Sequence, residues 1–281
     1  VGKVIKKIDS KPQKQLGIFR NTPNGPRVRS IDKSGQDWLV ELDESVAIGE
    51  GELVEVKKIY SGRRIRSDKV QISERLGDAL APRSISLIAI HQHNIPNTFP
   101  DEVILQSKKA TLVNNKKWHD YTEMPFVTID PKDARDHDDA CYAKLDDDPK
   151  NPGGHLLWVA IADVAHFVRS GGSIDNEARY RGNSTYFPDR VVPMLPDSLS
   201  GDLCSLHEGE KRACLVVKMK IDSQGNKLSH KFTRALIQSS ASLEYSEVQE
   251  AVDKGTGRQE VLQLLEQVIN PLYAAYNSLK V

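Results

Sequence analysis

The chain has 281 residues, enough for about two domains, and its 38% hydrophobic and 28% charged residues are typical of a globular protein. No apolar run reaches the roughly 18–20 residues of a membrane helix, no signal-peptide core opens the sequence, and three distant cysteines indicate the reducing cytoplasm. These features exclude a membrane protein, a secreted disulfide scaffold, a CxxC zinc site and a disordered chain, while the formal net charge of +0 identifies no partner.

Residues 1–75 are expected to form a small β-barrel. Short apolar, β-type runs alternate there with turn segments that contain Pro, Gly, Asn and Ser. The five runs are residues 1–8, 15–21, 27–31, 37–42 and 52–60. So many short strands predict a barrel of the OB or cold-shock kind, and other small barrels fit nearly as well. The aromatic residues Phe19, Trp38 and Tyr60 either stack on nucleic-acid bases or fill the core.

Residues 76–115 change to a helical pattern. Pro82 begins a run whose apolar residues have helical spacing. Pro100 precedes the acidic Asp101, and Lys108 lies at the opposite end of this second run, an arrangement that the helix dipole favours. The segment is therefore expected to be a helical connector.

Residues 116–281 alternate strand-like and helix-like runs, which predicts a mixed α/β or α+β domain. The expected strands are residues 126–130, 140–146, 155–163, 213–222 and 230–238. The expected helices are residues 242–255 and 258–280, the second interrupted by Pro271. Because the chain ends on a helix without a closing strand, we expect this domain to be the front part of a longer one.

Charge is unevenly distributed along the chain. Residues 1–80 contain 16 Lys and Arg against 12 Asp and Glu, whereas residues 130–148 contain eight Asp against three Lys and Arg. A basic end together with a concentrated acidic segment suits a protein that handles polyanions and holds a metal ion. Two differently solvated surfaces would explain the same charges equally well.

The most informative segment is VTIDPKDARDHDDACYAKLD, residues 127–146. Asp130 ends one expected strand, and three more aspartates follow before the next strand, at Asp136, Asp138 and Asp139. Four carboxylates so close together repel one another unless a cation or a proton intervenes. Oxygen ligands without thiolates favour Mg²⁺ or Mn²⁺ over zinc.

Carboxylates that hold Mg²⁺ beside a basic nucleic-acid path predict phosphodiester hydrolysis, in which metal ions activate water and stabilise the leaving oxygen. The simpler alternative is a solvated acidic loop, but aspartates that directly border two strands argue against it. For Asp146, Asp147 and Asp148, which lie next to Pro149, the sequence instead favours an exposed turn.

The segment TIDPKDARDHDDA resembles the signature of the ribonuclease II / ribonuclease R (RNB) family of 3′→5′ exoribonucleases, whose pattern Asp-x5-Asp-x-Asp-Asp falls on the same four aspartates. Residues 182–206, 213–222 and 242–252 agree as well. The resemblance covers essentially the whole chain, and its front half looks most like bacterial ribonuclease R. It implies a cold-shock barrel over residues 1–75, a connector over 76–115 and the first part of an RNB catalytic domain over 116–281.

The resemblance also implies residue roles. The expected Mg²⁺ ligands, with Mn²⁺ as a substitute ion, are Asp130, Asp136 and Asp139. Asp138 is similar to the aspartate whose loss stops catalysis but leaves RNA binding. Tyr186 resembles the aromatic residue that clamps the 3′-terminal base, and Tyr245 resembles a second tyrosine that contacts RNA. From the sequence alone, either tyrosine is equally well explained as a core residue. Phe187, next to Tyr186, is expected to point into the core, because adjacent residues of an extended segment point to opposite sides.

Other residues have two interpretations. Arg181 and Arg190, near the first tyrosine, either contact phosphates or are solvated loop residues. His137 lies inside the aspartate segment, where family members often carry an aromatic or apolar residue, and it either tunes the site or fills space. Cys204 and Cys214 are expected to be small buried hydrophobic residues. His166 is expected to be an interior strand residue rather than a ligand.

Taken together, the resemblance implies a processive, Mg²⁺-dependent hydrolase that removes nucleoside 5′-monophosphates from the 3′ end of single-stranded RNA. The alternative is an RNA-binding module without catalysis of its own, because further residues and an S1 domain that the family uses would fall beyond Val281. A DNA nuclease with the same metal chemistry also fits the carboxylates. A cytoplasmic location and no membrane partner are expected, and no protein partner is predicted.

Overall fold

The computed structural model describes residues 15–32, 35–41, 48–59, 69–112 and 117–280. The chain divides into two compact units, each described by itself below. The first unit is Val1–Thr98 with Ser184–Val192, and the second is Phe99–Asn183 with Pro193–Val281. The expected strand over residues 1–8 lies outside the described residues. The domain bounds expected from the sequence stay a prediction, since the units join segments that are distant in the chain.

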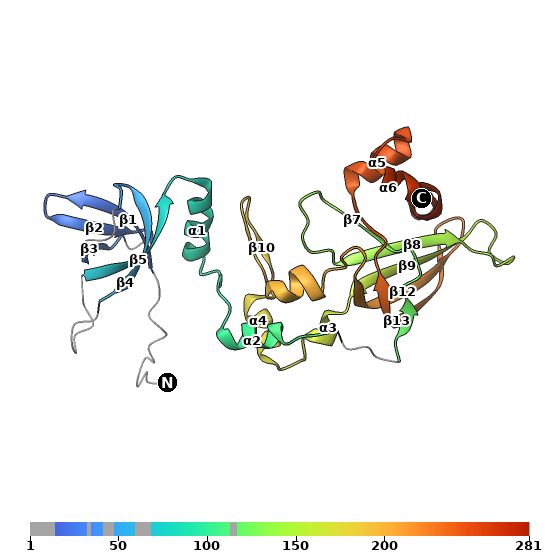
Figure 1. Ribbon diagram of the computed structural model, residues 1–281, viewed down its shortest axis with the longest axis horizontal. Coiled ribbons are helices and arrows are strands. Elements are labelled where there is room, and N and C mark those ends of the chain that lie inside the picture. Colours follow the sequence, from blue (N-terminus) through green and yellow to red (C-terminus); the bar gives the residue numbers. More distant parts are fainter. Residues whose placement is uncertain (1–14, 33–34, 42–47, 60–68, 113–116, 281) are drawn as a thin grey trace, which may run out of the picture. The chain divides into compact units, whose positions relative to one another are not determined.

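The first unit contains a closed five-stranded barrel with strand order β1-β2-β3-β5-β4 (Figure 1). Its strands are β1 (Gln15–Thr22), β2 (Gly25–Ser30), β3 (Asp37–Glu41), β4 (Glu52–Lys58) and β5 (Lys69–Asp78). Neighbours are antiparallel except β3 and β5, which run parallel. Phe19 and Trp38 are both buried in the barrel core, so they stabilise the barrel rather than offer surfaces to bases. The barrel confirms the expected architecture.

Strand β5 was not expected from the sequence. Of its ten residues only Val70 is fully buried, and most of the others are polar and exposed. Its pairing with β4 contains two register shifts, so the alternation of inward and outward residues is broken. A strand of this kind lacks the regular period of two by which strands are recognised in sequences.

Both helices of the expected connector form, as α1 (Pro82–Gln92) in the first unit and α2 (Asp101–Lys108) in the second. Pro82 is the first residue of α1, and Pro100 directly precedes α2. Helix α1 packs its apolar residues, including Leu87 and Ile88, against an end of the barrel around Leu16 and Leu53. Within the described residues, no helix has the length and apolar character needed to cross a membrane.

The second unit is built on a mixed seven-stranded sheet with strand order β14-β7-β8-β9-β12-β13-β6 (Figure 1). The strands are β6 (His119–Tyr121), β7 (Val127–Asp130), β8 (Asp139–Leu145), β9 (His155–Ala162), β12 (Lys211–Ile221), β13 (Lys227–Gln238) and β14 (Ala241–Glu244). The central strands are antiparallel, whereas β14 runs parallel to β7 and β6 parallel to β13. This confirms the expected mixed α/β domain.

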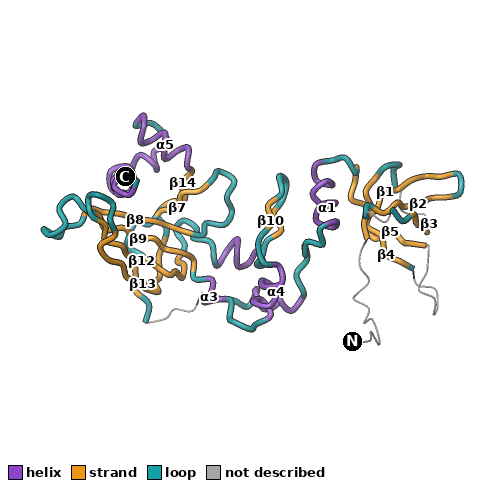
Figure 2. Tube along the Cα trace, turned by 180° about the vertical axis from the view of Figure 1, so that it is seen from behind, coloured by secondary structure: helices purple, strands orange, loops and turns teal. Residues whose placement is uncertain are grey.

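The helical segments of this unit are α3 (Val164–Phe167), α4 (Ser173–Arg181), the π-helical turn η1 (Leu199–Leu203), α5 (Tyr245–Lys254), α6 (Gln259–Leu264), the π-helical turn η2 (Leu265–Ile269) and α7 (Asn270–Leu279). Helices α5 to α7 pack on the part of the sheet that includes β7 and β14 (Figure 2). Val248, Val261 and Ile269 are buried there against Val127 and Leu243. Successive residues of a strand point to opposite faces of the sheet. The residues on the face away from α5 to α7 therefore belong to a second hydrophobic core.

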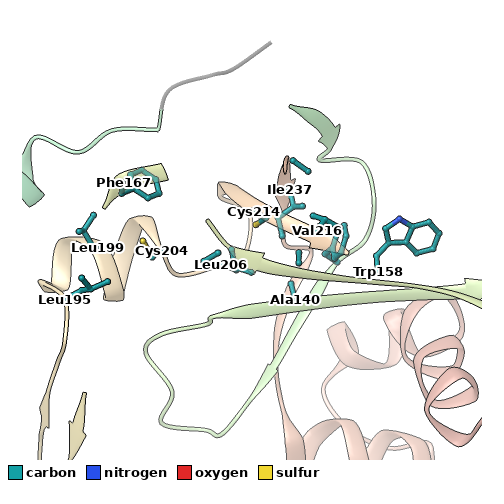
Figure 3. Close-up of a cluster of buried hydrophobic side chains, with 14 of the residues drawn as sticks. Ala140, Trp158, Phe167, Leu195, Leu199, Cys204, Leu206, Cys214, Val216 and Ile237 are labelled. Atoms are coloured by element: carbon teal, nitrogen blue, oxygen red, sulfur yellow. The ribbon is translucent and has the colours of Figure 1, made fainter. Parts of the chain in front are cut away.

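That second core joins small sheet residues to the segment around η1. Figure 3 shows Cys204 and Leu206 in the same cluster as Ala140 and Cys214. Both cysteines are buried as expected, and burial raises the pKa of the Cys204 thiol to about 12. They therefore act as small hydrophobic residues.

Three expectations for this unit need correction. The strand around residue 160 ends at Ala162, so His166 lies on the short helix α3, half-buried against the ring of Trp118. The helix expected from residue 242 begins at Tyr245, because the preceding residues form β14. The last helix is interrupted at η2 rather than at Pro271, which lies in the first turn of α7, where its missing N–H costs least.

Phe126→Ala is expected to lower the free energy of unfolding of the second unit by about 3–5 kcal/mol, because a fully buried ring would leave a cavity. The ring of Phe126 contacts the core beside Tyr142. The matched control is Phe232→Ala, at a ring that is 61% exposed. Urea denaturation should show a much smaller change for Phe232→Ala, and equal losses for the two variants would contradict this packing.

Candidate active site

The four aspartates of the signature lie in one loop between two neighbouring strands. Asp130 is the last residue of β7, and Asp139 is the first residue of β8. Pro131 has no N–H with which to continue the ladder, and its carbonyl accepts a hydrogen bond from the Ala134 N–H at 3.0 Å. The chain therefore turns at this point, and the remaining aspartates, Asp136 and Asp138, follow in the returning part of the loop.

Backbone hydrogen bonds fix the returning part of this loop. The N–H of His137 donates to Oγ of Ser205 at 2.9 Å, and the carbonyl of His137 accepts from the Leu206 N–H at 2.8 Å. The carbonyl of Asp138 accepts from the N–H of Ala162, the last residue of β9, at 3.0 Å. The loop is thus held by two different segments of the domain and is not a free solvated turn.

The carboxylates of the loop influence one another electrostatically. Asp138 and Asp139 keep exposed surface, but partial desolvation raises the pKa of both carboxyls above the ordinary value. The neighbouring charges of Asp136, Asp139 and Asp130 raise the pKa of Asp138 further, and the charge of Asp130 raises that of Asp139. Negative charges close to one another favour the binding of a proton or a cation.

Asp138→Asn is expected to raise the melting temperature of the metal-free chain at pH 7. A carboxyl group whose pKa is raised by folding binds its proton more tightly in the folded chain, so the fold loses stability as the pH rises through that pKa. The gain from Asn should shrink as the pH falls and vanish below 3.8, where the unfolded carboxyl is protonated too. Calorimetry from pH 3 to 7 measures it, with the exposed Asp133→Asn as control. Equal melting temperatures for Asp138→Asn and wild type at pH 7 would contradict the expectation.

The donor atoms fit a hard divalent cation. All four side chains offer carboxylate oxygens, which Mg²⁺ and Mn²⁺ prefer, and their repulsion is what such an ion relieves. In the part of the chain that the structure describes, however, no three His, Cys, Asp or Glu side chains converge closely enough to form a finished metal site. Asp130 instead lies 2.7 Å from Nδ1 of His137. The assignment of individual ligands stays a prediction.

Tyr245 lies next to this loop because of a parallel strand pair. In the register of β14 with β7, Glu244 lies opposite Asp130, so Tyr245 follows directly beyond the end of the Asp130 strand (Figure 2). Its side chain is 59% exposed in the first turn of α5. Glu244 itself was not singled out from the sequence; its carboxylate forms a capping box with Glu247 at the start of α5.

Tyr186 lies in the first unit, on a short hairpin formed by β10 (Thr185–Tyr186) and β11 (Val191–Val192). Its side chain is 66% exposed, so it is not a core residue. Phe187, expected in the core, is only half-buried and belongs to none of the hydrophobic clusters of the described residues. A ladder of two residue pairs has no second layer behind it that would bury the ring.

The arginines near this hairpin have structural partners. Arg190 pairs with Asp189 at 2.9 Å and donates to the carbonyl of Arg83 in α1 at 3.0 Å. The hydroxyl of Ser86 donates to the carboxylate of Asp189, so the hairpin is attached to α1 at two points. Arg181, in the second unit, has a side chain only 2% exposed. Both interpretations of Arg181 are therefore wrong, because its buried guanidinium is not a solvated loop group and does not reach a phosphate.

The acidic turn after β8 is also less exposed than expected. The ammonium group of Lys220 lies 3.0 Å from Asp146 and 2.5 Å from Asp148, and the Asp146 side chain is only 6% exposed. Hydrogen bonds from Asn151 and then from Lys220 lower the pKa of Asp146. Only Asp147, at 85% exposure of its side chain, matches the expectation. Asp146 and Asp148 thus attach the turn to β12 through their ion pairs with Lys220.

The family model for the RNB domain matches residues 118–280, more than half of the chain. The chain belongs to the RNB family. A second family model, for a cold shock domain, matches residues 29–100. Ribonuclease R of Vibrio parahaemolyticus is 38% identical over 99% of this chain, and ribonuclease R of Escherichia coli is 39% identical over 75% of it. This RNB chain covers only 34% and 26% of these relatives, about a third or less of their length.

Solved structures of RNB proteins have the same fold. The apo form of Mycoplasma genitalium RNase R has a TM-score of 0.72 and 27% identity, over 94% of this chain and 42% of its own. The same protein in complex with double-stranded RNA has a TM-score of 0.72 and 26% identity, over 98% of this chain and 48% of its own. The expected cold-shock barrel followed by an RNB domain is thereby confirmed.

Proposed function

We propose that the protein is a Mg²⁺-dependent 3′→5′ exoribonuclease that degrades single-stranded RNA processively to nucleoside 5′-monophosphates in the cytoplasm. The observation that carries the proposal is the loop between β7 and β8, which brings the four carboxylates of the signature into one segment bordered by two neighbouring strands. Membership of the RNB family and similarity to RNase R structures in complex with RNA support the same reaction class.

In this proposal each aspartate has a role. Asp130, Asp136 and Asp139 hold Mg²⁺, which supplies activation of water and stabilisation of the leaving oxygen when bound. Asp138 takes the central catalytic role beside them. Tyr245, exposed just beyond the end of β7, is suited to stack on or hydrogen-bond to a nucleotide near the carboxylates. The exposed ring of Tyr186 is proposed to stack on the 3′-terminal base.

A second candidate function is RNA binding without catalysis. It is favoured by the lack of a finished ligand set among the described residues. Concentrated carboxylates argue against it, because a pure RNA binder gains nothing from negative charge beside a phosphate backbone.

The test incubates the protein, both as encoded in full and as the 281-residue chain, with 5′-labelled single-stranded RNA and Mg²⁺. The expected result is progressive shortening from the 3′ end, with nucleoside 5′-monophosphates released from the earliest time points. Retarded migration of RNA without shortening would support the binding module. Products that arise from internal cleavage would contradict an exonuclease.

Tyr186→Ala is expected to weaken binding of short RNA, because stacking of one base contributes about 1–3 kcal/mol, and to change the length of the final product. Tyr186→Phe keeps the stacking surface and should change little. The measurements are the affinity for short single-stranded RNA and the limit digest on a sequencing gel.

Two further variants serve as controls for Tyr186. Tyr180→Ala removes another tyrosine that is 73% exposed and has no proposed role. Phe187→Ala removes the half-buried neighbour and should lower the melting temperature only slightly. A Tyr186→Ala protein with the wild-type end product and wild-type affinity would show that this ring does not hold the base.

A further inference from the structure

The aspartate loop is held by a buried serine that the sequence did not single out. Ser205 follows η1, and none of its surface is exposed. Its hydroxyl accepts a hydrogen bond from the His137 N–H at 2.9 Å and donates to the Arg135 carbonyl at 3.5 Å. The next residue, Leu206, donates its N–H to the carbonyl of His137 at 2.8 Å. Residues 205–206 thus bind both polar groups of the peptide backbone at His137.

Arg212 in turn holds the turn that carries this serine. Arg212 lies at the start of β12 and is only 8% exposed. Its Nε donates to the carbonyl oxygens of Ser205 at 2.9 Å and of Asp202 at 3.3 Å, and its Nη2 donates to Oδ1 of Asp202 at 3.0 Å. The N–H groups of a buried guanidinium need hydrogen-bond acceptors. For Arg212, most of these acceptors belong to Asp202 and Ser205.

These contacts form a continuous connection from the central sheet to the carboxylates. It runs from Arg212 through Ser205 to the backbone of His137, and His137 is the residue between Asp136 and Asp138. A shift of this backbone segment moves both carboxylates at once. Since the carboxylates repel one another, they would spread apart in a loop that nothing held.

We infer that Ser205 and Arg212 are positioning residues that hold the backbone of the aspartate loop and thereby strengthen its binding of a divalent metal ion. The inference rests on the proposed function for the identity of the site, but it concerns metal affinity and is testable without RNA. Partners that orient metal ligands from outside the ligand set typically change metal affinity by about 10–100-fold when they are removed.

The test measures binding of Mn²⁺ alone to the full chain by electron paramagnetic resonance of the free ion. The variant is Ser205→Ala, and the matched control is Ser200→Ala, whose hydroxyl bonds to the carbonyl oxygens of Leu195 and Pro196 and not to the aspartate loop. Ser205→Ala is expected to weaken Mn²⁺ binding by about tenfold or more, whereas Ser200→Ala should stay within about twofold of wild type. Arg212→Lys, which keeps the charge but loses the forked donors, should lie between the two.

Circular dichroism melting distinguishes a loss of positioning from a loss of folding, because Ser205→Ala should remain folded at the assay temperature. If Ser205→Ala does not remain folded, Arg212→Lys serves as an independent variant. Equal Mn²⁺ affinity for Ser205→Ala and Ser200→Ala would overturn the inference while leaving RNA cleavage by wild type intact. If Mn²⁺ binding depends on Ser205 but wild type cleaves no RNA, the proposed function alone is contradicted. No Mn²⁺ binding by wild type would overturn both.

Discussion

Asp138→Asn is expected to reduce RNA cleavage by orders of magnitude while RNA affinity stays near the wild-type value. The substitution keeps the size of the side chain and removes one negative charge from the loop between β7 and β8, where Asp138 lies among three other carboxylates. It removes no positive charge that would contact the phosphate backbone. The loss should therefore appear in the chemical step and not in binding.

Single-turnover cleavage and fluorescence anisotropy with the same RNA separate the two effects. Asp133→Asn is the matched control, because Asp133 is an exposed aspartate of the same loop outside the signature. It should cleave at nearly the wild-type rate. An Asp138→Asn protein whose RNA affinity falls as steeply as its cleavage rate would show that Asp138 organises the RNA path instead.

Removal of divalent metal with EDTA is expected to abolish cleavage entirely. The candidate site offers carboxylate oxygens, so Mg²⁺ or Mn²⁺ added back in excess should restore the rate and Zn²⁺ should do so poorly. The measurement is the initial rate of mononucleotide release as each ion is titrated into metal-free protein.

The control for this experiment is RNA binding in EDTA, which should persist because stacking and basic residues need no metal ion. Full activity in the presence of chelator would end the proposal of metal-dependent hydrolysis. Recovery with Zn²⁺ equal to that with Mg²⁺ would indicate nitrogen or sulfur ligands in place of the aspartates.

The aspartate loop was predictable from the sequence because its geometry is local. Asp130 and Asp139 border two strands that are close in the chain, so strand periodicity already places them at one edge of the sheet. The position of Tyr245 was expected only from family resemblance. Parallel pairing of β14 with β7 joins distant segments, and neither Glu244 nor its neighbour carries a local sign of it.

Side-chain burial on loops and at helix ends was the least predictable feature. Arg181 belongs to a Gly- and Pro-rich neighbourhood that is typical of exposed arginine, yet its guanidinium lies 3.6 Å from the ring centre of Phe99. Phe187 differs from its expectation in the opposite direction: its ring was expected in the core but is only half-buried, because a two-residue hairpin ladder has no core behind it. Both depend on which distant segment packs there, and no sequence period encodes that. The same holds for Ser205, whose hydroxyl acts on a loop far from it in the chain.

The pairing of β7 also sets the order in which the carboxylate loop can form as the chain folds. Strand β7 shares a full ladder with β14, from Ala241 opposite Val127 to Glu244 opposite Asp130, but only one residue pair with its sequence neighbour β8. Contacts between distant segments form slowly, because a long loop must close first. During synthesis the N-terminal part emerges early, and Glu244 follows much later. A partly synthesised chain therefore lacks the strand that secures Asp130, and the carboxylate loop is completed among the last steps of folding.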